Sequence, residues 1–162
     1  LNYLKQEGLV SKAIGIDISN VATESLKRFG IISVQADITN KEFLRNIPQA
    51  DYALLFEVLE HIQHSEEMLK AVYERVGKGL FFSFPNTGFI SYRLRLLLGR
   101  FPMQWRLFPG EHIRFWTARD LRWWIEALGY KNYRIFYYNG VPILNKIWPA
   151  LFAAGFVVYI KK

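Results

Sequence analysis

The feature that most constrains the fold is an alternation, along the whole chain, of short apolar runs with amphipathic helical segments. Such an alternation is typical of a parallel sheet flanked by helices. The runs that we predict as strands are residues 13–18, 32–36, 52–56, 79–84, 133–138 and 156–160. Most are apolar on both faces, as strands covered on both sides must be. The sequence therefore predicts an α/β, Rossmann-like fold with a doubly wound, mostly parallel sheet.

Capping residues mark where the intervening helices begin and end. We predict four helices with these marks: Ser19 or Asn20 to Gly30, Thr39 or Asn40 to Pro48, Ser65 to Gly77, and Thr117 to Gly129. The third helix carries an apolar stripe of Met68, Leu69, Val72 and Val76. In the fourth, Thr117 and Asp120 have the spacing of a capping box. No linker or internal repeat is visible, so we expect residues 1–162 to form a single domain.

Composition excludes several kinds of site. The chain of 162 residues has no cysteine, so it has neither disulfides nor thiolate metal ligands. Its three histidines, His61, His64 and His112, are scattered along the sequence, and we therefore expect no metal site.

Two segments bear on the cellular location. The first residues, LNYLKQEG, lack the apolar stretch of a secretory signal. Residues 147–160, IWPALFAAGFVVYI, are apolar, but a spanning helix needs about 20 such residues and this run contains Pro149 and Gly155. We interpret it as a buried helix followed by a buried strand, and we predict a cytoplasmic protein.

The net charge of +7 comes mostly from one segment. Between residues 92 and 122 there are seven arginines and only two acids, namely Arg93, Arg95, Arg100, Arg106, Arg114, Arg119 and Arg122 against Glu111 and Asp120. We expect residues 87–116 to form a lid-like insertion, and residues 90–116 to contact a membrane surface or a protein partner. The alternative is a packed helix with solvated arginines. No groove-reading motif accompanies the charge, so we expect no nucleic-acid partner.

Polar residues follow the first four predicted strands, at the edge where α/β sheets bind ligands. They are Asp17, Asp37, Glu57 and Asn86. A carboxylate at the position of Asp17 can accept hydrogen bonds from two ribose hydroxyls. Asp37 can pair with an adenine amino group while Ile38 packs on the ring, or it can cap the helix that starts near Asn40. Together the two acids favour an adenosine pocket.

A third motif points to a family. The stretch DYALLFEVLEHI, together with FSFPN, SYRLRLLLGRFPM and EHIRFWTARDL, resembles the class I S-adenosylmethionine-dependent methyltransferases. It is most similar to the MetW-like, methyltransferase type 11 group of methionine biosynthesis. The resemblance implies methyl transfer from S-adenosylmethionine to a small-molecule or lipid-like acceptor. The alternative is a non-catalytic partner of a homoserine acyltransferase; the oligomeric state is left open.

The resemblance also implies roles for residues at the strand ends. It places Asp17 at the ribose with Ile18 beside the adenine, Asp37 and Ile38 at the adenine edge, and Phe56 and Glu57 beside the methionine part. The family's first strand and glycine-rich turn are not in the sequence, so we expect the chain to be N-terminally incomplete by about 30 residues or more. Without that strand, its two neighbours expose backbone groups that cost about 1 to 3 kcal/mol each.

Methyl transfer mainly requires positioning, with removal of one proton where the acceptor carries it. The candidates for proton acceptor are Glu57, Glu60, His61 and His112, of which we assign His61 and His112 as catalytic. Asn86 and Arg114 are assigned to substrate binding, Arg114 through an acceptor carboxylate or phosphate. The alternatives are structural: His61 caps or packs a helix, His112 fixes its loop, and Arg114 is a surface charge.

Overall fold

The computed structural model describes residues 1–103 and 110–162, and the chain divides into two compact units, Leu1–Ile47 and Pro48–Lys162. All six predicted strands are present, each within three residues of its predicted bounds. The α/β class is confirmed. Arg106 lies outside the described residues, as does part of the predicted lid.

The unit Leu1–Ile47 is a strand–helix–strand crossover preceded and followed by a short helix. Its elements are α1 (Asn2–Gln6), β1 (Ile14–Asp17), α2 (Asn20–Arg28), β2 (Ile32–Gln35) and α3 (Lys41–Arg45). Strands β1 and β2 are parallel, with Asp17 opposite Gln35. Ser19 caps α2 by accepting a hydrogen bond from the Ala22 N–H, and Gly30 takes the left-handed conformation just after it, with φ +64°.

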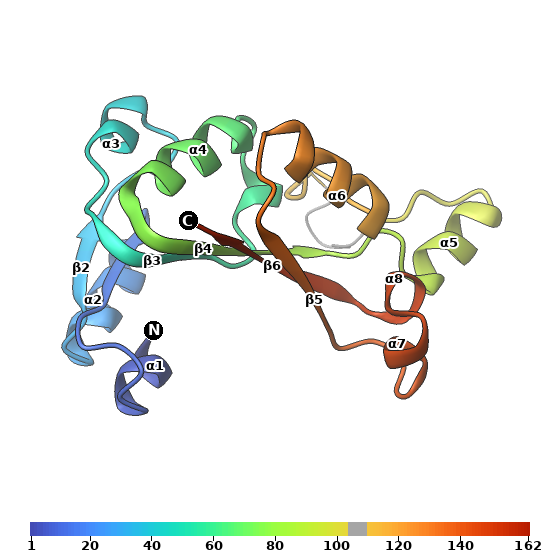
Figure 1. Ribbon diagram of the computed structural model, residues 1–162, viewed down its shortest axis with the longest axis horizontal. Helices are drawn as coiled ribbons and strands as arrows, with labels where there is room; N and C mark the ends of the chain where they lie inside the picture. The colour runs from blue at the N-terminus through green and yellow to red at the C-terminus, as the bar shows by residue number, and fades with distance from the viewer. Residues whose placement is uncertain (104–109) are drawn as a thin grey trace. The chain divides into compact units, whose positions relative to one another are not determined.

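The unit Pro48–Lys162 contains a four-stranded sheet (Figure 1). Its elements are β3 (Ala50–Leu55), the 3-10 helix η1 (Leu59–His61), α4 (Ser65–Arg75), β4 (Val76–Pro85), α5 (Ile90–Leu97), α6 (Ala118–Ala127), β5 (Tyr133–Tyr138), α7 (Leu144–Ile147), α8 (Pro149–Phe152) and β6 (Gly155–Lys161). The strand order is β3-β4-β6-β5. Strands β3 and β4 are parallel, whereas β6 is antiparallel to both of its neighbours, so the sheet is mixed.

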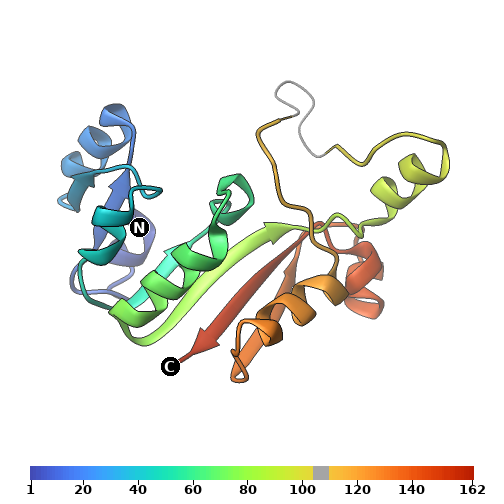
Figure 2. The same cartoon turned by 90° about the horizontal axis from the view of Figure 1, so that it is seen from above.

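Helices α4 and α6 cover the same face of this sheet (Figures 1 and 2). The predicted stripe of α4 is confirmed, because Met68, Leu69 and Val72 are buried. From α6, Trp124 packs against Phe82 and Phe84 of β4, with ring centroids 6.2 and 5.9 Å away. These contacts form the core of the unit.

The other face of the sheet carries aromatic rings that remain partly exposed. Phe81 stacks on Tyr159 with ring centroids 4.5 Å apart and also contacts Tyr52, which is 46% exposed. Side chains alternate between the faces of a strand, so these rings point away from α4 and α6. The expectation of strands buried on both faces therefore does not hold for this part of the sheet.

One predicted helix is confirmed at both ends, and another, α4, differs at both ends. Thr117 and Asp120 form the expected capping box at α6, whose end is marked by Gly129 with φ +89°. Helix α4, however, ends at Arg75, because Val76 is already extended and begins β4, which takes in Gly77. Ser65 is the first residue of α4 and not its cap, the position of which is held by His64.

Residues 147–160 take in the end of α7, then α8 and β6, so the predicted helical stretch followed by a strand is confirmed. The predicted burial of the helical part is wrong at its start, because Ile147 and Trp148 are 73% and 59% exposed. Among residues 1–103 and 110–162, no helix is long and apolar enough to cross a membrane.

Candidate functional site

In the unit Leu1–Ile47, the two predicted acids lie at the same edge of the β1–β2 pair. Asp17 ends β1, and the Ala36 N–H just beyond β2 donates to the Asp17 carbonyl at 3.1 Å. The Asp17 side chain uses Oδ1 to accept from the Ser19 N–H at 2.8 Å, and no partner of Oδ2 is found within the described residues. A carboxylate with one oxygen oriented by the backbone can still accept from a ligand hydroxyl.

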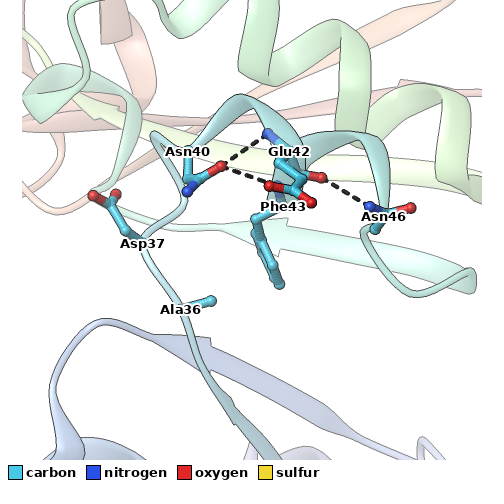
Figure 3. Close-up of a pocket in the computed structure, with 6 residues that line it drawn as sticks. All are labelled: Ala36, Asp37, Asn40, Glu42, Phe43 and Asn46. Atoms are coloured by element: carbon cyan, nitrogen blue, oxygen red, sulfur yellow. Dashed lines mark hydrogen bonds between the residues drawn. The ribbon is translucent and has the colours of Figure 1, made fainter.

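Asp37 has a different local role. Its Oδ1 accepts from the N–H and the hydroxyl of Thr39, at 2.8 and 2.7 Å. These two hydrogen bonds, first that of the hydroxyl and then that of the N–H, lower the pKa of Asp37. The cap of α3 is Asn40, which accepts from Glu42 and Phe43 (Figure 3). The alternative that Asp37 caps this helix is therefore wrong.

A hollow of about 370 Å³ adjoins Asp37 (Figure 3). Its lining residues are Ala36, Asp37, Asn40, Glu42, Phe43 and Asn46. Of the two isoleucines that follow the acids, Ile18 is 66% exposed and Ile38 is half-buried. Partly exposed apolar side chains next to hydrogen-bond acceptors are suited to bind a planar ring that also carries polar groups.

In the unit Pro48–Lys162, Glu57 is held in a strained position just after β3. Its φ is +51°, a left-handed conformation that non-glycine residues rarely adopt and that concentrates at functional sites. Ser83 fixes it twice, since the Ser83 hydroxyl accepts from the Glu57 N–H at 2.8 Å and donates to Glu57 Oε1 at 2.6 Å. Phe56 beside it is 48% exposed.

Tyr138 is a third group bound to this carboxylate. Its hydroxyl donates to Glu57 Oε1 at 3.0 Å, and burial together with the Glu57 charge raises the pKa of Tyr138. Gly155 leaves room for the ring, because a Cβ there would lie 2.4 Å from it. Sequence reasoning missed Ser83 and Tyr138, since each lies within a strand far from Glu57 in the chain, where nothing distinguishes it from a packing residue.

Glu60 and His61 lie on η1, which continues from Glu57. Glu60 is fully buried, and burial together with the nearby Glu57 raises its pKa to about 8. Its two carboxylate oxygens have no hydrogen-bond partner in the described part of the chain. A buried carboxyl without partners is costly and marks a functional candidate.

His112 is brought onto His61 by two hydrogen bonds that end on backbone carbonyls. The Ile113 N–H donates to the Glu60 carbonyl at 3.0 Å, and His61 Nδ1 lies 2.8 Å from the Glu111 carbonyl. The two imidazole rings are 4.7 Å apart at 85°. Burial, and then the neighbouring His61, lower the pKa of His112. His61 and His112 are therefore neighbours in space although they are far apart in the sequence, so scattering along the sequence is no argument against a shared site.

Arg114 is engaged within the protein. It donates to both carboxylate oxygens of Glu66, at 2.5 and 2.8 Å, and to the carbonyls of Ile62 and Gln63. It also lines a hollow of about 620 Å³ with Gln63, Ile113, Phe115 and Trp116. Its contacts show it as an anchor of the 110–116 loop, so it is not the free surface charge of the alternative; substrate binding by Arg114 stays a prediction.

Asn86 is fully buried at the end of β4. Its amide nitrogen donates to the carbonyls of Ala150 and Ala153, at 3.1 and 2.8 Å, and its oxygen accepts from the Gly88 N–H at 2.9 Å. These contacts give Asn86 a structural role, and they lend no support to its predicted contact with substrate.

Comparison with known proteins identifies the family. Residues 1–135 match the family model described as a methyltransferase domain. This match covers most of the chain, which therefore belongs to the methyltransferase domain family. No curated protein matches the chain.

Solved structures of methyltransferases share the fold at low identity. A SAM-dependent methyltransferase from Thermotoga maritima, a possible histamine N-methyltransferase, is 16% identical with a TM-score of 0.64, over 93% of this chain and 72% of that one. A SAM-dependent methyltransferase from Archaeoglobus fulgidus is 15% identical with a TM-score of 0.57, over 99% and 91%. The magnesium protoporphyrin IX methyltransferase from Synechocystis, with bound SAH, is 16% identical with a TM-score of 0.59, over 96% and 65%.

Proposed function

We propose that this protein transfers a methyl group from S-adenosylmethionine to a small-molecule or lipid-like acceptor. The observation that carries the proposal is the pair of acids, Asp17 and Asp37, at one strand edge in a chain of the methyltransferase domain family. The similar Synechocystis structure contains SAH, the product of that donor.

The residues at this edge fit an adenosine group. Asp17 would accept hydrogen bonds from ribose hydroxyls, and Asp37 would accept from the adenine amino group beside the hollow that it lines. Ile18 and Ile38 would pack on the adenine, as the resemblance implies. Phe56 and Glu57 are proposed for the methionine part, where the Glu57 carboxylate can pair with a positive charge.

On the acceptor side, we propose that His61 and His112 serve the removal of the acceptor's proton. They are in ring contact at the carboxyl end of β3, next to Glu57 and Glu60. The donor supplies an electrophilic methyl group, and these residues orient the acceptor oxygen or nitrogen and take up or displace its proton.

The first experiment measures donor binding to Asp17→Asn by isothermal titration calorimetry. The amide oxygen of Asn can still accept from the Ser19 N–H, so the start of α2 is kept while the charged acceptor is lost. We expect the affinity for S-adenosylmethionine to fall by at least about tenfold, equivalent to the loss of about 1.4 kcal/mol. Glu24→Gln, an exposed acid in the same unit, is the matched control.

Unchanged affinity in Asp17→Asn would remove Asp17 from the site. Absence of donor binding by the wild-type protein would contradict the proposed function. The alternative kept from the sequence, a non-catalytic partner of a homoserine acyltransferase, predicts co-purification with that enzyme even when Asp17→Asn abolishes donor binding.

A lipid-like acceptor is favoured by the surface of α5. Leu94, Leu96, Leu97 and Leu98 are 51–81% exposed, and residues 87–103 include three arginines and no acid. Exposed leucines interleaved with cations match the chemistry of an anionic lipid surface. We propose that α5 contacts such a surface.

Vesicle co-sedimentation tests this contact. We expect binding to phosphatidylserine-containing vesicles, weak binding to phosphatidylcholine alone, and a severalfold loss with Leu97→Glu. Val21→Glu is the control, because Val21 on α2 is as exposed as Leu97, at 81% each. Equal binding by both variants would contradict a role for α5.

A further inference from the structure

Three side chains with metal-binding atoms meet beyond the end of β3. Glu60, His61 and His112 each place one donor atom within 4.8 Å of the other two. All three belong to the unit Pro48–Lys162, and two segments about 50 residues apart supply them. The cluster differs from a group of surface acids because it combines a carboxylate with two imidazoles.

Glu60 is the strongest indication that a cation belongs here. Its side chain is 0% exposed, and neither carboxylate oxygen has a hydrogen-bond partner within the described residues. Its Oε1 points toward the imidazole pair, 4.0 Å from His61 Nε2. A buried carboxyl group without partners stays uncharged unless a positive charge lies beside it, and a bound cation would supply that charge.

The hydrogen bond of His61 prepares its other nitrogen for a metal. A carbonyl oxygen can only accept, so His61 Nδ1, 2.8 Å from the Glu111 carbonyl, must carry the hydrogen. In the neutral ring, this leaves the Nε2 lone pair facing Glu60. Metal-binding histidines typically donate their second nitrogen to a carbonyl or carboxylate in this way, which fixes the tautomer and the ring orientation.

The third ligand arrives on a loop that is tied to the first two. The Ile113 N–H donates to the Glu60 carbonyl at 3.0 Å, immediately after His112 in the chain. This bond holds the His112 ring against His61 with 4.7 Å between centroids. Backbone hydrogen bonding therefore brings the three residues together.

We propose that Glu60, His61 and His112 bind a divalent first-row transition metal such as Mn²⁺ or Zn²⁺. Two imidazole nitrogens and one carboxylate oxygen suit these ions, whereas Ca²⁺ prefers an all-oxygen shell. Ligands about 2.1 Å from one ion lie roughly 3 to 3.5 Å apart, so binding requires the donor atoms to close by about 1 Å.

The use of this metal rests on the proposed function. A metal here would bind the acceptor oxygen and lower its pKa, so that its proton passes to water; His61 and His112 would then serve proton removal by holding the metal and would not take up the proton themselves. The metal site itself is tested without donor or acceptor, which keeps its failure distinguishable from failure of methyl transfer.

The experiment uses the full chain without a polyhistidine tag, stripped with a chelator and dialysed. Isothermal titration with Mn²⁺ and with Zn²⁺ should show one site per chain, and the Mn²⁺ electron paramagnetic resonance signal should change on binding. We expect Glu60→Gln and His112→Gln to weaken binding by at least about tenfold. His64→Gln, the remaining histidine, should bind as the wild type does.

Two results would overturn the proposal: no stoichiometric binding by the folded wild-type protein, or equal binding by Glu60→Gln, His112→Gln and His64→Gln. Circular dichroism checks that each variant is folded. If a ligand variant does not fold, the melting temperature of the wild-type protein is the test. A metal that binds the folded protein must raise this temperature, so Mn²⁺ or Zn²⁺ should raise it at the concentrations that saturate the calorimetric site. An unchanged melting temperature would reject the site.

Discussion

At the scale of single residues, polar side chains fix the architecture of the unit Pro48–Lys162 through hydrogen bonds to the backbone and to Glu57. Asn86 donates to the carbonyl of Ala150 in α8 and to that of Ala153 just after it, and accepts from the Gly88 N–H ahead of α5. Ser83 and Tyr138 hold Glu57 in its left-handed conformation. The residues around the candidate site are therefore fixed before any ligand binds, a requirement for precise positioning in catalysis.

Replacing Asn86 by Ala should destabilise the protein. The change leaves one part-buried carbonyl, one buried carbonyl and one buried N–H without their side-chain partner, at a cost of about 1 to 3 kcal/mol in the free energy of unfolding. Urea unfolding followed by circular dichroism measures the effect. Asn132→Ala, an exposed asparagine, should stay within about 0.5 kcal/mol of the wild type; an equally small effect for Asn86→Ala would show that its bonds are replaceable.

At the scale of elements, one carboxylate joins α4, α6 and the 110–116 loop. Glu66 of α4 accepts from Trp124 Nε1 of α6 at 2.9 Å and from the Arg114 guanidinium. Burial raises the pKa of Glu66, but the hydrogen bonds from Trp124 and Arg114 outweigh that effect and leave it below its ordinary 4.5. The loop that carries His112 is thereby tied to two helices.

This tie should make stability depend on pH in the acid range. Because the pKa of Glu66 is lower in the folded than in the unfolded protein, its stabilising contribution is complete above about pH 4.5 and is lost as the pH falls through the folded value. The stability difference between wild type and Glu66→Gln should therefore be constant from pH 7 to 5 and shrink below that.

Urea unfolding at a series of pH values measures this difference. Glu74→Gln, an exposed acid on the same helix, gives the background dependence. A difference between wild type and Glu66→Gln that grows as the pH falls would contradict the lowered pKa.

At the scale of the whole molecule, donor binding should be visible as thermal stabilisation. A ligand that binds only the folded protein stabilises it by about 2.7 kcal/mol at 100 times its dissociation constant. We expect S-adenosylmethionine to raise the melting temperature of the wild type by several degrees and to leave that of Asp17→Asn unchanged at the same concentration. Differential scanning fluorimetry measures both, and equal shifts in the two proteins would contradict the role of Asp17.

The strands, their order along the chain and most helix starts were predictable because they depend on local patterns. Apolar runs define the six strands, and Ser19, Asn40 and Thr117 cap helices through bonds to residues two or three positions away. The acids at the ends of β1 and β2 were found for the same reason, since a strand's end is a property of the sequence next to it.

By itself, the sequence determined the α/β class, the strand-end acids and the family resemblance, all of which rest on neighbours along the chain. Only the tertiary structure decided that β6 is antiparallel to β4 and β5, that Asn86 and Arg114 are engaged in internal bonds, and that His112 lies against His61. These features depend on contacts between residues that are not neighbours in the chain, from 17 positions apart for Tyr138 and Gly155 to 82 for Gly79 and Lys161. No local pattern records such contacts, because they form only when helices and strands pack and bury their polar groups together.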